Sequence, residues 1–204
     1  HFSSDIWGTF WGHLAGVPVI ISNRRDMGFW RKPWHTWAYR FINGWVKRIV
    51  VVAKSVKEMV KAAEGVSDAK IEVIYNGIEL KNDAVSVPQT FRMELGIAAN
   101  DPVIVHVANL KPVKGHSFLI QAMADVVGQI PQAKLLLIGK DELNGTLQAL
   151  TEQLGLKNNV FFLGKRQDVL NLLNIADICV LPSLSEGMSN AILEYMACRK
   201  PVVV

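Results

Sequence analysis

The fold is decided by residues 103–127, which read V-I-V-H-V-A-N-L-K-P-V-K-G-H-S-F-L-I-Q-A-M-A-D-V-V. The first six residues form an apolar run of strand length, a turn with Pro and Gly follows, and the rest has the apolar period of a helix. This unit recurs to the end of the chain. Further strands are predicted at 135–138, 160–163, 178–181 and 201–204, and helices at 117–127, 146–154, 168–175 and 190–198.

Strands that are apolar on both faces and alternate with helices predict a parallel sheet with helices on both sides. Residues 101–204 are therefore expected to form a Rossmann-like, doubly wound α/β domain. Ligands of such domains bind outside the carboxyl ends of the strands, so the loops that leave the strands are where chemistry is expected.

Residues 1–78 repeat the pattern more loosely and indicate the C-terminal part of a second Rossmann-like domain. Strands are predicted at 17–22, 48–53 and 71–75, and helices at 33–46 and 55–63. Asn76-Gly77 is a turn signal, and residues 79–100, whose first half is polar and contains Pro88, are predicted to link the two domains. A cleft between two α/β domains is the expected place for a ligand.

The composition is that of a globular protein. Half of the 204 residues are apolar and 20% are charged, which excludes disorder, collagen and coiled coil. The 22 basic and 18 acidic residues leave a formal charge of +4, a mild excess that suits phosphate groups or an anionic surface. That excess does not by itself indicate nucleic acid.

The cysteines and the apolar runs indicate a cytoplasmic chain. Cys179 and Cys198 form no C-x-x-C pair and lie in apolar stretches, which is typical of a reducing compartment. No apolar run approaches the roughly 20 residues that span a bilayer. The chain begins at His1 without Met or a signal-peptide pattern and ends inside a predicted strand, so we expect both domains to be incomplete parts of a longer protein.

Aromatic residues are concentrated near the start of the chain. All six tryptophans lie in the first 45 residues, and residues 29–48 combine seven aromatic and five basic residues with no acidic one. The favoured alternative is a helix that packs its tryptophans into the domain core. The same mixture suits contact with an anionic membrane surface, at the inner face of the membrane for a cytoplasmic chain. Stacking on nucleic acid bases is a third alternative, which we do not expect.

Several cofactor motifs are missing from the sequence. No G-x-G-x-x-G or G-x-x-x-x-G-K-[ST] follows a predicted strand, so neither a dinucleotide nor a Walker loop is indicated. There is no H-E-x-x-H and no cluster of His and Cys. We therefore expect neither a metal nor another cofactor.

Residues 183–190, S-L-S-E-G-M-S-N, form a small polar loop between a predicted strand and a predicted helix. Backbone N–H groups at the start of a helix suit phosphate oxygens, and Gly187 lets a ligand approach the backbone closely. The alternative is an ordinary β–α turn capped by Ser or Asn.

Two acidic residues at this loop are eight positions apart. On a helix, Glu186 and Glu194 would be separated by a rise of about 12 Å, more than the roughly 5–9.5 Å between the paired carboxylates of glycoside hydrolases. They would therefore hold opposite ends of one elongated ligand. A solvated glutamate at each position is the alternative.

A basic loop follows the strand predicted at 103–108. Lys114 precedes a helix at the ligand edge of the sheet, where a lysine can neutralise a diphosphate, and Lys111 adds a second positive charge. A surface lysine before a helix is the alternative for Lys114.

Taken together, these segments resemble the retaining glycosyltransferase family 4, also called glycosyl transferases group 1, of the GT-B fold. The resemblance covers nearly the whole chain. It is carried by V-I-Y-N-G-I (73–78), V-A-N-L-K-P-V-K-G-H (107–116), L-L-L-I-G-K (135–140), V-F-F-L-G (160–164), E-G-M-S-N-A-I-L-E (186–194) and A-C-R-K-P-V-V (197–203). Of these, the two glutamates with the following A-C-x-K-P-V-V are the most specific.

The resemblance implies an enzyme with two Rossmann-like domains that transfers a sugar from a nucleoside diphosphate-sugar donor, with retention and without a metal, to a saccharide or lipid-linked acceptor. The donor is a substrate, so no cofactor is implied. By position, Glu186 would face the donor sugar and Lys114 would neutralise the departing diphosphate, while Glu194 would bind the ribose hydroxyls. Further donor-binding positions are implied at Asn109, Lys111, Gly139, Gly164, Lys165, Arg166, Gly187, Met188, Ser189 and Asn190.

The chain departs from the family pattern at two positions. Asn109 stands where many members have an Arg that pairs with the Lys on the diphosphate, and Lys111 is the candidate to supply that charge. Arg199 stands where the family has the Gly of an A-C-G-K-P turn. On the acceptor side, His1 corresponds to a first-domain histidine near the reaction centre.

We expect the whole enzyme to act in cell-surface polysaccharide or glycolipid synthesis. Two other functions remain open on the same fold. A nucleotide-sugar epimerase or hydrolase would share the diphosphate site, and a non-catalytic module would bind the nucleotide sugar without transferring it.

Overall fold

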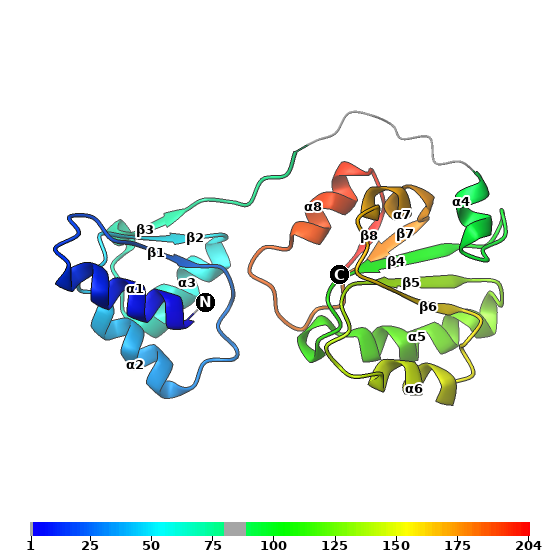
Figure 1. Cartoon of the computed structure of the whole chain (residues 1–204), viewed down its shortest axis with the longest axis horizontal. Coiled ribbons are helices and arrows are strands. Elements are labelled where there is room, and N and C mark those ends of the chain that lie inside the picture. The colour runs from blue at the N-terminus through cyan, green and yellow to red at the C-terminus, as the bar shows by residue number, and fades with distance from the viewer. Residues whose placement is uncertain (1, 80–88) are drawn as a thin grey trace. The chain divides into compact units, whose positions relative to one another are not determined.

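The computed structural model describes residues 2–79 and 89–204, which form two compact α/β units. The first unit comprises residues 1–77 with 185–189, and the second comprises residues 78–184 with 190–204. Each contains one parallel sheet (Figure 1). The predicted α/β class with parallel sheets is confirmed.

The first unit has a three-stranded sheet of order β1-β2-β3. Its elements in chain order are α1 (Phe2–Leu14), β1 (Ile21–Arg24), α2 (Pro33–Ile42), β2 (Arg48–Val51), α3 (Lys54–Glu64), the 3-10 turn Asp68–Lys70 and β3 (Ile71–Val73). Alternate residues of β1 and β2 are buried, because the helices cover one face of the sheet. On the other face, where the described residues place no helix, Ile21 is 60% exposed.

The second unit has a five-stranded sheet of order β6-β5-β4-β7-β8. Its elements are α4 (Gln89–Glu94), β4 (Val103–Val107), the 3-10 turn Pro112–Lys114, α5 (His116–Gln129), β5 (Lys134–Ile138), α6 (Thr146–Gln153), β6 (Val160–Gly164), α7 (Val169–Ile175), β7 (Ile178–Val180), α8 (Asn190–Ala197) and β8 (Val202–Val203). In register, Val105 of the central β4 lies between Leu136 of β5 and Cys179 of β7.

The second sheet is covered on both faces, as its continuous apolar strands predict. The helices α5 and α6 lie against one face (Figure 1), where Leu119, Ile120, Met123 and Leu147 pack on Leu135 and other strand residues. The opposite face carries α7 and α8. Two apolar clusters, one on each face, thus hold this doubly wound unit together.

The order of the second sheet creates a switch point. The chain moves outward from β4 through β5 to β6, and then returns to the other side of β4 to form β7 and β8. The loops that leave β4 and β7 therefore run in opposite directions from neighbouring strands, and the crevice between such loops is where open α/β sheets bind ligands.

The first unit differs most from the sequence-based expectation in α1, β1 and α2. Helix α1 was not predicted, because Gly8 and Gly12 lower its helix propensity. Strand β1 covers Ile21–Arg24, whereas the sequence predicts a strand at 17–22. Helix α2 ends at Ile42 and not at residue 46 as predicted, since the chain turns at Asn43.

The segment predicted as a linker, residues 79–100, is partly structured. Its residues 80–88 lie outside the described part of the chain, but α4 follows, and Phe91, Leu95 and Ile97 pack into the second unit's core. The packed second unit therefore includes residues before 101.

Candidate functional site

The loops after β4 and β7 meet within the second unit. The Leu184 N–H donates a hydrogen bond to the Val113 carbonyl at 2.9 Å. Gly115 has a φ of +70° and lies so close to Pro182 that a Cβ would collide with the Pro182 carbonyl. Only glycine fits both this backbone conformation and this approach, so Gly115 lets the two loops close over the switch point.

Lys114 is the last residue of the 3-10 turn in the β4–α5 loop and is half-buried. The left-handed Gly115 directly after it redirects the chain into α5. The loop thus places Lys114 near the carboxyl end of β4, the edge of the sheet where the sequence predicts ligand binding.

Two buried histidines lie beneath this loop. The rings of His106, on β4, and His116, at the start of α5, have centroids 4.4 Å apart. The His106 Nδ1 lies 2.8 Å from the Val180 carbonyl, which accepts only from a protonated nitrogen, so a neutral His106 carries its proton on Nδ1. Burial, with the nearby His116 and Lys114, lowers the pKa of His106 to about 4. Burial also lowers the pKa of His116.

Asn109 and Lys111, at the start of the β4–α5 loop, both contact the Glu142 carboxylate. The Asn109 side-chain amide donates to Glu142 at 3.2 Å and accepts from the Lys140 N–H at 3.1 Å. Lys111 forms an ion pair with Glu142 at 3.2 Å. Asn109 therefore joins the loops after β4 and β5, and the Lys111 charge is balanced by a neighbouring carboxylate.

Four predicted donor-binding residues lie at the ends of β5 and β6. Gly139 lies against the β4–α5 loop, where a Cβ would collide with the Ala108 carbonyl. Gly164 ends β6 with a φ of +63°. Arg166 forms an ion pair with Asp168 at 2.6 Å, and Lys165 is exposed beside it. These residues lie at the same carboxyl edge of the sheet as Lys114.

The residues of the E-G-M-S-N-A-I-L-E motif are divided between the units. Glu186, Gly187, Met188 and Ser189 group with residues 1–77, and Met188 packs against the apolar cluster there. Asn190 and Glu194 belong to the second unit, because α8 begins at Asn190. The helical spacing assumed between Glu186 and Glu194 is therefore wrong, since residues 183–189 contain no helix.

Glu194 lies in the second turn of α8 and is partly buried. Burial raises the pKa of its carboxyl group, so the ionised form lacks part of its hydration. Two hydroxyl donors, such as those of a ribose, would replace that hydration by charge-assisted hydrogen bonds.

Sequence reasoning missed the residue that positions α8. Tyr195 is fully buried, and its hydroxyl accepts a hydrogen bond from the Val107 N–H at 2.8 Å. This bond ties α8 to the end of β4 next to the loop that carries Lys114. A tyrosine in a helix that also carries Ile192, Leu193 and Met196 was the available signal, because a buried Tyr needs a polar partner.

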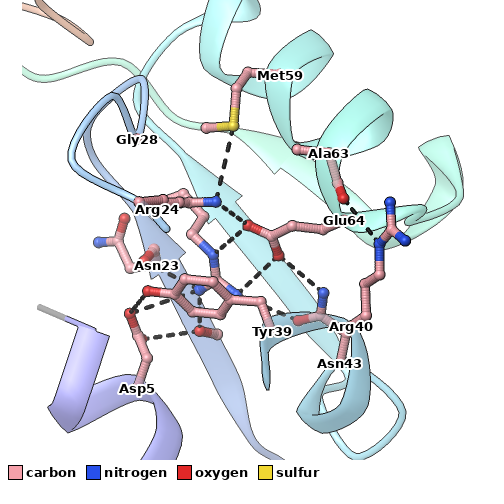
Figure 2. Close-up of polar contacts among 12 residues, drawn as sticks. Asp5, Asn23, Arg24, Gly28, Tyr39, Arg40, Asn43, Met59, Ala63 and Glu64 are labelled. Carbon is pink, nitrogen blue, oxygen red and sulfur yellow. Dashed lines mark hydrogen bonds and ion pairs between the residues drawn. The ribbon is translucent and has the colours of Figure 1, made fainter. Parts of the chain in front are cut away.

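A buried charge network supports the loop after β1 in the first unit (Figure 2). Arg24 donates to both oxygens of Glu64 at 3.0 and 3.1 Å, and Asn43 donates to Glu64 at 2.9 Å. Arg31, from the loop itself, donates to the same carboxylate at 2.8 Å. Burial by itself would raise the pKa of Glu64, but these donors hold it below its ordinary value.

The remaining expectations concern His1, metal binding, the two cysteines and membrane-spanning helices. His1 lies outside the described residues. Among residues 2–79 and 89–204, no three His, Cys, Asp or Glu side chains are grouped so that they could hold a metal ion. Both cysteines are unpaired, and burial raises the pKa of the Cys179 thiol to about 12. No helix in the described parts of the chain is long and apolar enough to cross a bilayer.

The two α/β units with parallel sheets have the fold of GT-B glycosyltransferases. The sequence profile of "Glycosyl transferases group 1" matches residues 88–204, and that of "Glycosyltransferase Family 4" matches residues 1–82. The chain belongs to the glycosyl transferases group 1 family.

Known relatives agree with this assignment. The chain is 30% identical to the Escherichia coli UDP-Gal:alpha-D-GlcNAc-diphosphoundecaprenol alpha-1,3-galactosyltransferase, over 98% of the chain and 55% of the relative. It is 32% identical to an uncharacterised glycosyltransferase of Methanocaldococcus jannaschii, over 77% of the chain and 42% of the relative. The chain thus spans about half the length of these relatives.

Among solved structures, the chain resembles Anabaena HepE in complex with UDP and glucose, with a TM-score of 0.88 and 25% sequence identity. The match covers the whole chain and 57% of HepE. The chain also has the fold of WaaG, a glycosyltransferase involved in lipopolysaccharide biosynthesis, with a TM-score of 0.75 over 96% of the chain and 62% of WaaG.

Proposed function

We propose that this chain is the donor-binding part of an enzyme that transfers a sugar from a nucleoside diphosphate-sugar to a saccharide or lipid-linked acceptor, with retention of anomeric configuration. The observation that carries the proposal is the pair of loops closed over the β4–β7 switch point, with Lys114 in one and the start of α8 after the other. HepE, with UDP bound, shares this fold over the entire chain.

The proposed chemistry depends on stabilising the departing diphosphate. The Lys114 ammonium group and the N–H groups at the start of α8 would offset the negative charge that develops on the leaving group, so no metal would be required. Glu186 would face the donor sugar, and Glu194 would accept hydrogen bonds from the ribose hydroxyls.

The remaining positions would shape the donor pocket. Asn109 would keep the β4 and β5 loops together through its bonds to Glu142 and Lys140. Gly139 and residues 164–166 would line the base pocket, and the N–H groups of residues 187–190 would lie near the sugar and phosphates. The ion pair with Glu142 reduces the charge that Lys111 would present to a diphosphate.

The acceptor class and location are also part of the proposal. The relatives include the E. coli enzyme named for a diphosphoundecaprenol-linked acceptor and a Corynebacterium glutamicum enzyme named for a phosphatidylinositol mannoside acceptor. We infer a role in cell-surface polysaccharide or glycolipid synthesis, with the enzyme in the cytoplasm at the inner face of the membrane.

Calorimetric titration of the longest natural form of the chain with UDP, GDP and ADP tests the donor site. We expect saturable binding of one nucleotide, with binding about tenfold or more weaker in Lys114→Ala and Glu194→Ala because each removes a charge-assisted contact. Lys157→Ala and Glu152→Ala are matched controls, since these residues pair with each other at the surface, away from the loops, and should bind like the parent.

Product analysis then tests the reaction. With a matching donor and acceptor, a glycosylated product with retained configuration, formed equally in EDTA, would support transfer without a metal. Release of a free epimer or free sugar from donor alone would indicate an epimerase or hydrolase. Donor binding without any product would indicate a non-catalytic module, and absence of nucleotide binding would contradict the site itself.

A further inference from the structure

Six aromatic residues of the first unit are joined by a continuous series of ring contacts. On α1, Trp7 contacts Phe10 and Phe10 contacts Trp11, with ring centroids 6.1 and 5.2 Å apart. Phe10 also contacts Trp45, at 6.3 Å. The series continues on α2, where Phe41 lies 5.0 Å from Trp45 and 6.1 Å from Trp37. The rings thus bridge the two helices.

Residues with helical spacing form one exposed side of each of the two helices. Trp7, Trp11 and Leu14 are separated by four and three residues on α1, and Trp34, Trp37 and Phe41 by three and four on α2. Such spacing places each trio on one side of its helix. The trios face solvent instead of the core: Trp7, Trp11 and Trp37 are 59%, 61% and 69% exposed. The alternative that these tryptophans fill the domain core is therefore not supported.

The loop before α2 carries a further exposed ring and contains several hydrogen bonds. Phe29 is 74% exposed. On either side of it, Asp26 accepts hydrogen bonds from the Gly28 N–H at 2.8 Å and the Trp30 indole at 3.1 Å. Arg31 anchors the end of the loop in the buried Glu64 network of Figure 2. The loop that carries Phe29 and Trp30 is thus held by hydrogen bonds on both sides of the exposed rings.

The charge around the rings is positive. Residues 1–57 contain nine Lys and Arg and two Asp, and no acidic residue lies between Asp26 and Glu58. Lys32, Arg40 and Lys47 are exposed, whereas Asp26 is engaged in the loop and Asp5 accepts hydrogen bonds from Ser22 and Tyr39. Exposed aromatic rings flanked by unopposed cations match the anionic headgroup region of a bilayer.

We propose that α1, the 26–32 loop and α2 form a docking surface for an anionic lipid bilayer. We call it the aromatic surface. Its exposed members are Trp7, Trp11, Leu14, Phe29, Trp30, Trp34, Trp37 and Phe41. The rings enter the headgroup region while Lys32, Arg40 and Lys47 contact lipid phosphates. This surface would hold the enzyme at the membrane, the location proposed above. The inference requires neither donor binding nor sugar transfer.

The six tryptophans provide a direct measurement, because all lie in residues 1–45 and the second unit has none. The longest natural form of the chain is mixed with phosphatidylglycerol–phosphatidylcholine vesicles or with pure phosphatidylcholine vesicles. We expect co-sedimentation with the anionic vesicles only, weakened by salt. Brominated lipids in the anionic vesicles should quench the tryptophan emission.

Two variants test the rings and the charges separately. Trp37→Ser with Phe41→Ser and, in a second protein, Lys32→Glu with Lys47→Glu should each weaken anionic-vesicle binding by about tenfold or more. Phe118→Ser and Lys157→Glu are matched controls, because these side chains are exposed on the second unit. Circular dichroism confirms that each variant is folded.

Three outcomes would overturn the proposal. The first is a chain that binds UDP but no vesicles, which leaves the donor site intact and removes the docking surface. The second is equal binding by the parent and the ring variant. The third is a concentration-dependent dimer that disappears in Trp37→Ser with Phe41→Ser, which would assign the surface to a second copy of the chain.

Discussion

At the scale of single residues, His106 makes stability depend on pH. Its pKa is about 4 in the folded protein because burial disfavours the charged ring, and about 6.5 in the unfolded chain. Between these values the unfolded chain binds a proton that the folded protein does not. Stability should therefore fall as the pH is lowered from about 6.5 to 4, by about 2–3 kcal/mol from this residue.

Urea denaturation across this pH range measures the effect. The variant His106→Gln should lose this part of the pH dependence, whatever its stability at neutral pH. His13→Gln is the control, because His13 is exposed and stacks on Trp45. A slope for His106→Gln equal to that of the parent would show that His106 does not titrate as inferred.

Glu64 balances two buried cations in the first unit. In Glu64→Gln, Arg24 and Arg31 would keep their positive charges in the interior without this carboxylate. We expect a loss of about 3–5 kcal/mol in the free energy of unfolding, the usual cost of removing one partner of a buried ion pair. Tryptophan-detected urea unfolding measures it, and Glu58→Gln, an exposed partner of Lys61, should change little.

At the scale of elements, helix α8 ends in a conformation that favours glycine. Arg199 has a φ of +55°, and the Lys200 N–H donates to the Tyr195 carbonyl at 3.0 Å to close the turn. An L-residue in this conformation costs about 1 kcal/mol relative to Gly. Arg199→Gly should therefore stabilise the second unit by about that amount.

Circular dichroism in urea would detect the shift. Arg199→Ala is the informative control, since it removes the same side chain and retains the Cβ that opposes this conformation. If both variants were stabilised equally, loss of the arginine, and not the backbone conformation, would be the cause.

At the scale of the whole molecule, the two units should respond separately to a nucleotide. Tryptophan emission reports only the first unit, while most described helices and strands lie in the second. UDP at about 100 times its Kd should stabilise the unit that binds it by about 2.7 kcal/mol. We expect UDP to raise the circular dichroism midpoint by more than the tryptophan-detected midpoint.

Thermal denaturation followed by both signals makes this comparison. A shift of both midpoints by the same amount would indicate that the units unfold as one. A shift of the tryptophan signal alone would place the nucleotide on the first unit and contradict the proposed donor site.

Much of the second unit could be predicted from sequence because its signals are local. Apolar runs of strand length and the turn at Lys114-Gly115 each depend on a few neighbouring residues, and the predicted strand at 103–108 differs from β4 by one residue. Helix α1 could not be predicted in this way, since Gly8 and Gly12 oppose it locally and its contacts with α2 are tertiary.

By itself, the sequence determined the α/β class, the family resemblance and the strand-end positions of Asn109, Lys111 and Lys114, because period and motif are properties of the chain. Only the tertiary structure decided which groups are paired and which are exposed. In the structure, Lys111 forms an ion pair with Glu142, α8 begins after Glu186 at Asn190, and Trp37 is exposed to solvent. These outcomes depend on which elements pack together, and packing joins residues that the sequence keeps far apart.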